Sequence, residues 1–352
     1  MFHRAASTRV PTRRLLGAVA TFALALAAFA PALAQSDVVN VYTARHYDTD
    51  DRLYRMFEER TGIRVQLLEG SSDELISRMT SEGANSPADV FVTVDAGRLW
   101  RAERAGLLAP TSSATLEERI PANLRHPDGF WFGLSQRHRG IVYAVDAVDP
   151  ADLSSYEDLV HERWNRRICI RSSNNVYNQS LLASMIATHG AEEAEAWAAA
   201  IVDNMARPPQ GGDSDQIRAV AAGQCDVAIA NHYYLARLMT SEDSADREVA
   251  ERVGYFFPNQ DGRGVHVNVS GAGVVATAPN PDNAVRFLEF LASDEAQAIF
   301  AGANNEYPAV EGVAPSEVAR GFGDYRTDAL NVATYGEHNP EAIRIFDRVG
   351  WR

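Results

Sequence analysis

Short apolar runs alternate with amphipathic stretches along almost the whole chain, and this pattern leaves few folds open. A strand-like run, a loop and a helix-like stretch recur in that order from residues 38–43, 63–68, 88–94, 168–172 and 226–230. Such alternation predicts an α/β protein in which helices are layered on mostly parallel sheets. One sheet would be very wide for so many units in 352 residues, so we expect two lobes.

Two β-rich segments are the candidate crossings between these lobes. One lies around Arg139 and the other over residues 265–275, so the chain would leave the first lobe near Arg139 and return near Gly264. A ligand would then bind in a cleft between the lobes, beyond the carboxyl ends of the strands. The expected N-terminal lobe is residues 35–139 with 264–314, and the expected C-terminal lobe is residues 140–263 with 315–352.

The first 34 residues have the features of an export signal. Residues 1–14 hold four arginines and no acid, residues 15–30 are nearly all apolar, and Ala32-Leu33-Ala34 fits the small-residue cleavage rule. The apolar run is too short for a stable membrane anchor, although a retained anchor is the alternative. We expect a signal peptide over residues 1–34 and export to the periplasm, by the general or the twin-arginine route.

Charge and composition exclude several classes of function. The net charge of −14 argues against a nucleic-acid partner and against an anionic membrane surface. All 33 basic residues are arginine, which excludes lysine chemistry such as a Schiff base or a phosphate-binding P-loop. We expect a monomer that is not embedded in a membrane.

The two cysteines, Cys169 and Cys225, lie in strand-like runs of the expected second lobe. In an oxidising compartment, one structural disulfide is the favoured interpretation. The loops after both strands carry tyrosines that would reach one cleft, so the strands are expected to be near neighbours, which would allow a bridge within the lobe. The alternative is two buried free thiols that pack like small apolar side chains.

Tyrosines follow three of the predicted strands, at the points where helices are expected to begin. They are Tyr47, Tyr177, Tyr233 and Tyr234. Histidine precedes two of these positions, as His46 and His232. For any single position, a tyrosine at the wet rim of a sheet is the alternative interpretation. Three such positions together indicate a binding site.

A cluster of phenols with an imidazole favours a hard, highly charged cation. Phenolate is a hard oxygen donor, and tyrosine is a known ligand of iron in haem proteins. Helix N-termini beside the tyrosines would favour phenolate over phenol. Zn²⁺ would require Cys, His and carboxylate ligands, and Ca²⁺ would require a carboxylate-rich loop. The residues therefore point to Fe³⁺ as the bound cargo.

Four segments resemble the tyrosine-rich ferric-iron-binding proteins, which are periplasmic receptors of iron ABC transporters within the extracellular solute-binding family. The segments are RHYDTD (45–50), SSNNVYNQS (172–180), ARPPQG (206–211) and NHYYLAR (231–237). The resemblance covers essentially the whole mature chain. It implies a two-lobed, transferrin-like periplasmic binding protein fold with two crossover strands, and delivery of iron to an ABC permease rather than catalysis. The metal ligands that it implies are His46, Tyr47, Tyr177, Tyr233 and Tyr234.

Arginines near the first crossing are candidates to balance the charge of this site. Four phenolates with a neutral imidazole would over-neutralise Fe³⁺, so no synergistic anion is expected. Arg137 and Arg139 are predicted to face the cleft, where they would offset phenolate charge or hold a carbonate; the alternative is two solvated arginines. Arg45 and Arg171 are further candidates of the same kind. Whether Fe²⁺ or Fe³⁺ is the physiological cargo stays open.

Three other polar residues lie near these motifs and are not expected to bind the metal. In a strand-end run the side chain of His232 should point away from that of Tyr233, so His232 is left out of the ligand set. Asp213 and Asp215 follow a Pro-Pro turn and are expected to cap the next helix.

Two rival functions were weighed against an iron receptor. An exported iron-dependent enzyme is disfavoured because Gly133-Leu-Ser-Gln-Arg137 lacks the last glycine of a nucleophile elbow and no H-E-x-x-H occurs. A receptor of the same fold for a sugar, polyamine or oxyanion is the other alternative. Sugar clefts stack tryptophan on the ring, and only Trp131 lies near a predicted crossing.

Overall fold

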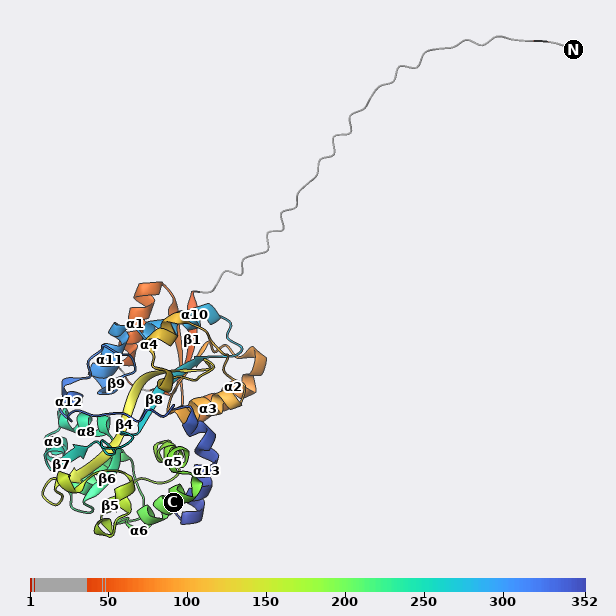
Figure 1. Cartoon of the computed structure of the whole chain (residues 1–352). Helices are drawn as coiled ribbons and strands as arrows, with labels where there is room; N and C mark the ends of the chain where they lie inside the picture. Colours follow the sequence, from red (N-terminus) through yellow and green to blue (C-terminus); the bar gives the residue numbers. More distant parts are fainter. Residues whose placement is uncertain (2, 4–36, 46, 48) are drawn as a thin grey trace. The chain divides into compact units, whose positions relative to one another are not determined.

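The structure is a computed structural model that describes residues 1, 3, 37–45, 47 and 49–352 (Figure 1). The predicted signal peptide over residues 1–34 and the predicted ligand His46 lie outside the described residues. Within the described part of the chain, no helix is both long enough and apolar enough to cross a membrane.

The elements alternate as the sequence pattern predicts. The strands are β1 (Val38–Thr43), β2 (Arg64–Glu69), β3 (Val90–Val94), β4 (Phe132–Ala144), β5 (Ile168–Cys169), β6 (Val227–Asn231), β7 (Val253–Phe256), β8 (Val267–Val274) and β9 (Tyr307–Pro308). The α-helices are α1 (Asp50–Thr61), α2 (Ser72–Glu82), α3 (Ala96–Arg104), α4 (Ala114–Arg119), α5 (Val176–His189), α6 (Ala191–Asp203), α7 (Asp213–Ala221), α8 (His232–Met239), α9 (Ser244–Glu251), α10 (Pro281–Leu291), α11 (Asp294–Asn304), α12 (Glu317–Arg320) and α13 (Thr334–Val349). Short 3-10 helices are η1 (Gly83–Asn85), η2 (Ala122–Leu124), η3 (Pro150–Asp152), η4 (Glu157–Val160) and η5 (Glu162–Trp164).

The strands form one hydrogen-bonded path in the order β2-β1-β3-β8-β4-β6-β5, with β7 and β9 also paired to β4. β1 is parallel to β2 and β3, and β5 is parallel to β6. Every ladder of β4 and β8 is antiparallel. The prediction of mostly parallel sheets is therefore wrong, because β4 and β8 run against all of their neighbours.

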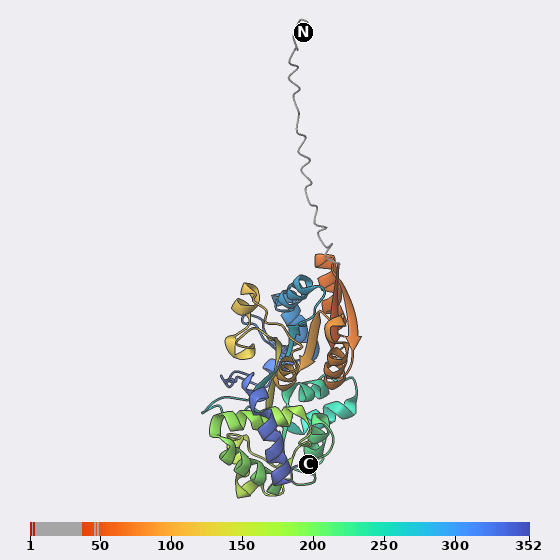
Figure 2. The same ribbon diagram turned by 90° about the vertical axis from the view of Figure 1, so that its right-hand side faces the viewer.

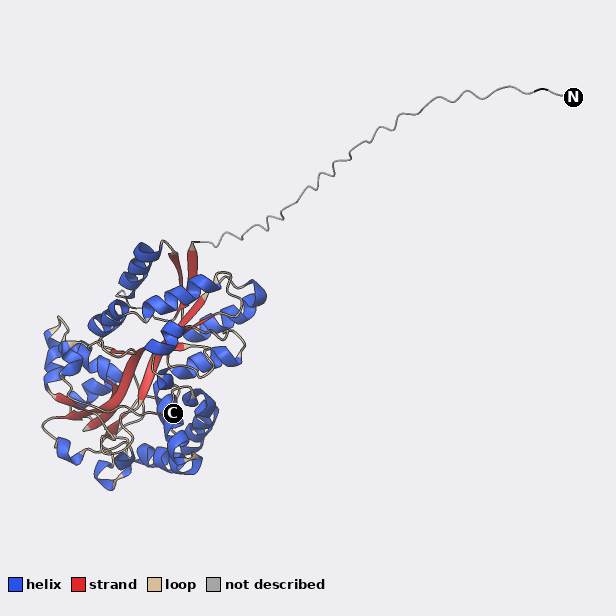
Figure 3. Ribbon diagram, turned by 45° about the horizontal axis from the view of Figure 1, so that its top comes forward, coloured by secondary structure: helices blue, strands red, loops and turns tan. Residues whose placement is uncertain are grey.

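The long strand β4 belongs to two groups of strands. Through His138 it pairs with β8 and β9, and from Arg139 it pairs with β6 and β7. The first strand group is β1, β2, β3, β8, β9 and the first part of β4; the second strand group is β5, β6, β7 and the rest of β4. Helices flank the strands of both groups (Figure 3). The change of partner falls at Arg139, where the sequence predicts the first crossing.

Glycine at position 140 makes this change of partner sterically feasible. A Cβ atom there would overlap the ring of Tyr255 on β7, so only glycine lets the two strands approach. Next to it, the backbone N–H of Arg139 donates to the carbonyl of His266, just before β8, at 3.1 Å. The two crossing segments are thus hydrogen-bonded to each other where β4 passes between the strand groups.

Helix α13 touches helices on both strand groups. It packs along α5 and also contacts α6 and α3 (Figure 2, dark blue helix). Gly336 in its first turn lies directly against the ring of Trp100 on α3, where a Cβ would overlap that ring. The chain end is therefore an integral part of the packing.

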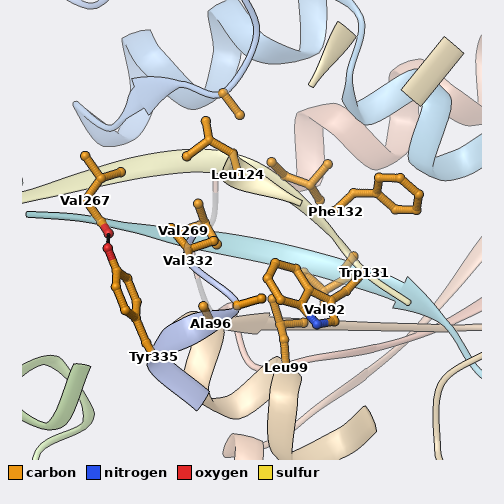
Figure 4. Close-up of a cluster of buried hydrophobic side chains, with 14 of the residues drawn as sticks. Val92, Ala96, Leu99, Leu124, Trp131, Phe132, Val267, Val269, Val332 and Tyr335 are labelled. Carbon is orange, nitrogen blue, oxygen red and sulfur yellow. Dashed lines mark hydrogen bonds between the residues drawn. The ribbon is translucent and has the colours of Figure 1, made fainter. Parts of the chain in front are cut away.

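Apolar side chains bury the crossing strands against α3 and α13. Phe132 of β4, Val269 of β8 and Leu99 of α3 are fully buried in one cluster (Figure 4). The hydroxyl of Tyr335 on α13 donates to the carbonyl of Val267 at 2.9 Å. Each fully buried apolar side chain of this kind contributes about 1.5–3 kcal/mol to stability.

The predicted disulfide is confirmed. Cys169 of β5 is bonded to Cys225, two residues before β6, with Cα atoms 5.8 Å apart. β5 and β6 are parallel neighbours in the second strand group, with Ile168 opposite Val227. The bridge therefore joins the two strands that lead to α5 and α8.

Candidate metal centre

The second strand group presents three tyrosines at two neighbouring helix starts. β6 is buried along its whole length and ends at Asn231, where α8 begins, so Tyr233 and Tyr234 lie in the first turn of α8. Tyr177 lies in the first turn of α5, and its backbone N–H donates to the Asn175 side chain at 3.0 Å. Because β5 and β6 are parallel, both helix starts lie at the same edge of the sheet.

These three phenols contact one another. The hydroxyl of Tyr233 donates to the hydroxyl of Tyr177 at 3.2 Å. The ring centroids of Tyr233 and Tyr234 are 4.3 Å apart. Tyr233 is fully buried, whereas Tyr177 and Tyr234 are partly exposed. The two helix starts thus form one phenol cluster that is open to solvent on one side.

Tyr47 joins the cluster from the first strand group. Its partly buried ring lies in the loop between β1 and α1, 4.8 Å from the guanidinium carbon of Arg45 and 5.0 Å from that of Arg237. Arg237, on α8, also lies 5.1 Å from the Tyr233 ring centroid and 5.8 Å from that of Tyr234. The structure therefore brings together all four predicted tyrosines, while His46 lies outside the described residues.

The buried phenols keep their protons in the free protein at neutral pH. Burial, together with the neighbouring phenol of Tyr177, raises the pKa of Tyr233 well above its usual value. Burial likewise raises the pKa of Tyr234, again with Tyr177 adding to it. A cation that binds these oxygens must displace the protons, so binding is coupled to proton release.

Arg137 and Arg139 are buried, so the alternative of two solvated arginines is wrong. They are 2% and 1% exposed. The guanidinium carbon of Arg137 lies 5.5 Å from the Tyr233 ring centroid, and that of Arg139 lies 5.8 Å from the Tyr177 ring centroid. Nη1 of Arg137 has no hydrogen-bond partner among the described residues. Burial opposes the charge of Arg137, but Glu306 and the nearby tyrosines hold its pKa above the usual value.

Asp213 holds two of the cleft arginines, and the prediction that it caps a helix is wrong. Its fully buried carboxylate pairs with Arg139 at 3.0 Å and Arg171 at 3.2 Å, and accepts the Asn231 N–H at 2.9 Å. Asp215 does cap α7, by accepting a backbone N–H at 2.6 Å. Residues of a first helical turn can point outward to cap or inward to the core, and the sequence pattern did not separate the two.

Glu306 and Arg237 are two residues that the sequence reasoning missed. Glu306 is fully buried just before β9 and pairs with Arg45 at 3.1 Å and Arg137 at 2.9 Å. No motif marks it. Arg237 stands four residues after Tyr233 on the same helix, a spacing that places two side chains on one face and was available as a signal.

The imidazole of His232 packs edge-on against the Tyr233 ring, with ring centroids 5.7 Å apart, and both of its nitrogens are engaged with the backbone. Its Nδ1 accepts the His138 N–H at 3.2 Å, so Nε2 carries the proton and donates to the Asn305 carbonyl at 2.7 Å. Burial lowers its pKa to about 4. A neutral imidazole with both nitrogens occupied has no lone pair left for a metal.

Phenol oxygens are the donor set that the geometry offers. In the described part of the chain, no group of three or more His, Cys, Asp or Glu residues is placed to hold a metal ion. The donors that the described residues bring together are phenols, which as phenolates are hard oxygen ligands for a cation such as ferric iron.

Comparison with known proteins agrees with this geometry. Residues 52–321 match the model of the bacterial extracellular solute-binding proteins. Iron uptake protein A2 of Synechocystis is 54% identical over 323 residues, which are 91% of this chain and 92% of that protein. The Fe(3+)-binding periplasmic protein of Serratia marcescens is 30% identical, over 85% of this chain and 86% of its own length.

Solved structures show the same architecture. The Trichodesmium protein in complex with iron and citrate is 56% identical, with a TM-score of 0.88 over 90% of this chain and 100% of that one. The ferric binding protein from Campylobacter jejuni is 42% identical, with a TM-score of 0.84 over 89% and 100% of the two chains. Their two-lobed fold confirms the predicted fold class. On these grounds, the chain belongs to the bacterial extracellular solute-binding protein family.

Proposed function

We propose that this protein is a periplasmic receptor that captures ferric iron and delivers it to an ABC permease. The observation that carries the proposal is the meeting of Tyr47, Tyr177, Tyr233 and Tyr234 around buried guanidinium groups. Relatives that are named for iron uptake or ferric-iron binding, and that are similar over most of the chain, support the same cargo. The proposed ligands are these four tyrosines and His46.

The charges around the cluster suit Fe³⁺ without a further anion. Bound phenolates would carry more negative charge than Fe³⁺ carries positive. Arg139 and Arg171 share the single carboxylate of Asp213, which leaves one positive charge beside Tyr177 to offset that excess. The Trichodesmium structure contains citrate as well as iron, which makes an anion-free site a distinct and testable feature of this proposal.

Iron capture is proposed to close the cleft. Tyr47 comes from the first strand group and the other tyrosines from the second, so only a closed form offers all of them to one ion. Binding then shifts an open–closed equilibrium toward the closed form. We propose residues 35–139 with 264–314 and residues 140–263 with 315–352 as the two moving bodies of a monomer that is exported by a cleaved signal.

Metal loading tests the proposal directly. Iron-free protein receives freshly dissolved ferric chloride in buffer without bicarbonate, phosphate or citrate, and a visible phenolate-to-iron absorption band is expected. Tyr234→Phe keeps the ring and removes the donor oxygen, so it should weaken binding and reduce the band. Tyr143→Phe, at the far end of β4, is the matched control and should leave both unchanged.

Each unfavourable result has a distinct meaning. If the wild-type protein takes up no iron in any buffer, the proposed cargo is wrong. Colour that develops only after an anion is restored would contradict the anion-free site but keep the cargo. Undiminished binding by Tyr234→Phe would remove that residue from the ligand set.

A further inference from the structure

The turn at Asn305–Glu306 contacts residues that lie beside the tyrosine of the first strand group and beside those of the second. Asn305 ends α11 in the left-handed conformation, with φ of 55°, which turns the chain into β9. Its carbonyl accepts a hydrogen bond from His232, which is the first residue of α8 and the neighbour of Tyr233. The next residue, Glu306, is fully buried, and the two arginines that it pairs with, Arg45 and Arg137, both belong to the first strand group.

Every oxygen of the Glu306 carboxylate is used. Oε1 accepts from Nε of Arg137 at 3.0 Å and forms an ion pair with its Nη2 at 2.9 Å. Oε2 accepts from Nη1 of Arg45 at 3.1 Å and from the hydroxyl of Ser135 at 2.6 Å. Ser270 also contacts both guanidiniums. Burial alone would raise the pKa of this carboxyl, but Arg45 and Arg137 hold it at about 2, so Glu306 is an anion at neutral pH.

Each of the two arginines that pair with Glu306 lies beside a different tyrosine, one on each strand group. Arg45 lies 4.8 Å from the ring centroid of Tyr47, and Arg137 lies 5.5 Å from that of Tyr233. Both guanidiniums are 2% exposed, so their positions depend on protein partners and not on water. Arg45 also pairs with the buried Asp50 at 2.8 Å, whereas the ion pair that the structure describes for Arg137 is with Glu306. Removing Glu306 therefore leaves the buried charge of Arg137 uncompensated, and this guanidinium must move.

We propose that Glu306 is a positioning residue. By holding Arg45 and Arg137 in one buried cluster, it fixes the position of Tyr47 relative to Tyr233 for metal binding. The inference rests on the proposed iron-binding function and adds to it a residue that touches neither the metal nor a phenol. One carboxylate would then fix the relative position of the tyrosines from the two strand groups. Partners of this outer kind commonly change metal affinity by about 10–100-fold.

Glu306→Gln is the first test, because it keeps the shape of the side chain and removes its charge. We expect iron affinity to fall by about tenfold or more. The phenolate-to-iron band should also shift in energy, because the position of Tyr47 or Tyr233 changes. The matched control is Asp89→Asn, another fully buried carboxylate, which is bonded to Asn40 and Asn280 away from the tyrosines. This control should alter thermal stability without moving the band.

A double-mutant cycle tests the route through arginine. In an Arg45→Met background, Glu306→Gln should cost clearly less affinity than in the wild type, because the bridge is already broken. If Glu306→Gln fails to fold, Glu306→Asp takes its place, since it keeps the charge but is too short to reach both arginines. Intermediate affinity and a smaller band shift are then expected.

The outcomes separate this inference from the proposed function. Absence of iron binding by the wild-type protein would overturn both. Normal wild-type binding, with a folded Glu306 variant that matches Asp89→Asn in affinity and spectrum, would overturn only the role of Glu306. Strictly additive losses in the cycle would overturn the route through Arg45.

Discussion

The two sides of the tyrosine cluster are held in place by different means. On the second strand group, Tyr233 is bonded to Tyr177 and packed on Tyr234, and the disulfide joins the two strands that lead to these residues. On the first strand group, Tyr47 lies in a loop, and the ring contacts that the structure describes for it are with the guanidiniums of Arg45 and Arg237.

If the four tyrosines bind iron as proposed, this difference predicts an order of events in metal capture. A site whose donors already touch one another loses little freedom when an ion arrives. A donor held only through arginine can approach afterwards and complete the coordination. The second strand group therefore suits first contact with the ion, and the Tyr47 loop suits closure over it.

Tyr233→Phe should cost more iron affinity than Tyr47→Phe. The hydroxyl of Tyr233 is hydrogen-bonded to Tyr177, so its loss would remove one proposed ligand and disturb another, by more than the about 10–100-fold that outer partners cost. Tyr47→Phe would remove one proposed ligand and leave the other side intact. Competition titration against a chelator of known strength measures both losses. A larger loss for Tyr47→Phe would reverse the proposed order.

Much of this arrangement is visible in the sequence, and the hidden part has a common cause. Strand ends and helix starts are local features, so the tyrosine positions could be predicted from patterns. Glu306 acts through residues that lie 171 and 261 positions away in the chain, and no local pattern encodes such pairings. The direction of β4 and β8 within the sheet is equally non-local. Asp213 was misassigned because helix-capping residues and buried ion-pair residues share the same local signature.

Loss of the disulfide should weaken the second strand group specifically. Cys169→Ser with Cys225→Ser removes a covalent constraint on the unfolded chain, which typically contributes about 2–4 kcal/mol. Denaturant unfolding of the iron-free protein measures the change. Tyr47→Phe serves as the control and should leave the unfolding free energy almost unchanged. Equal stability with and without the bridge would show that hydrogen bonding alone fixes the two strands.

Acid should loosen the Glu306 cluster. Its folded-state pKa of about 2 lies below the unfolded value of about 4.3, so its stabilisation is present above pH 4.3 and is lost as the pH falls toward 2. The expected loss is on the order of 2–3 kcal/mol, and Glu306→Gln should remove this part of the acid profile.

A surface carboxylate provides the comparison for that profile. Glu195 is exposed and paired with Arg348, so Glu195→Gln should leave the acid profile nearly as in the wild type, because exposed ion pairs contribute little. Parallel unfolding curves for the wild type and both variants across this pH range give the answer. An unchanged acid profile in Glu306→Gln would place the acid-sensitive groups elsewhere.

Closure should produce the smallest signal. If the Tyr47 side moves toward a second side that is already formed, the radius of gyration decreases slightly when iron binds. X-ray scattering with and without iron measures it, and the Tyr47→Phe variant should show less contraction. Identical curves for the loaded and free wild-type protein would mean that the cleft is already closed before the ion arrives.

The order of strands along the chain has a consequence for synthesis. The second strand group is assembled from one continuous stretch, from the end of β4 to β7, whereas the first strand group needs β8 and β9, which follow that stretch. During synthesis, about half of the chain is made between β3 and its partner β8, and the segments that carry Tyr177, Tyr233 and Tyr234 are made before β8. A chain that stalls or is truncated before β8 would therefore carry these three phenols without the strands that complete the Tyr47 side and without α13, which packs along α5.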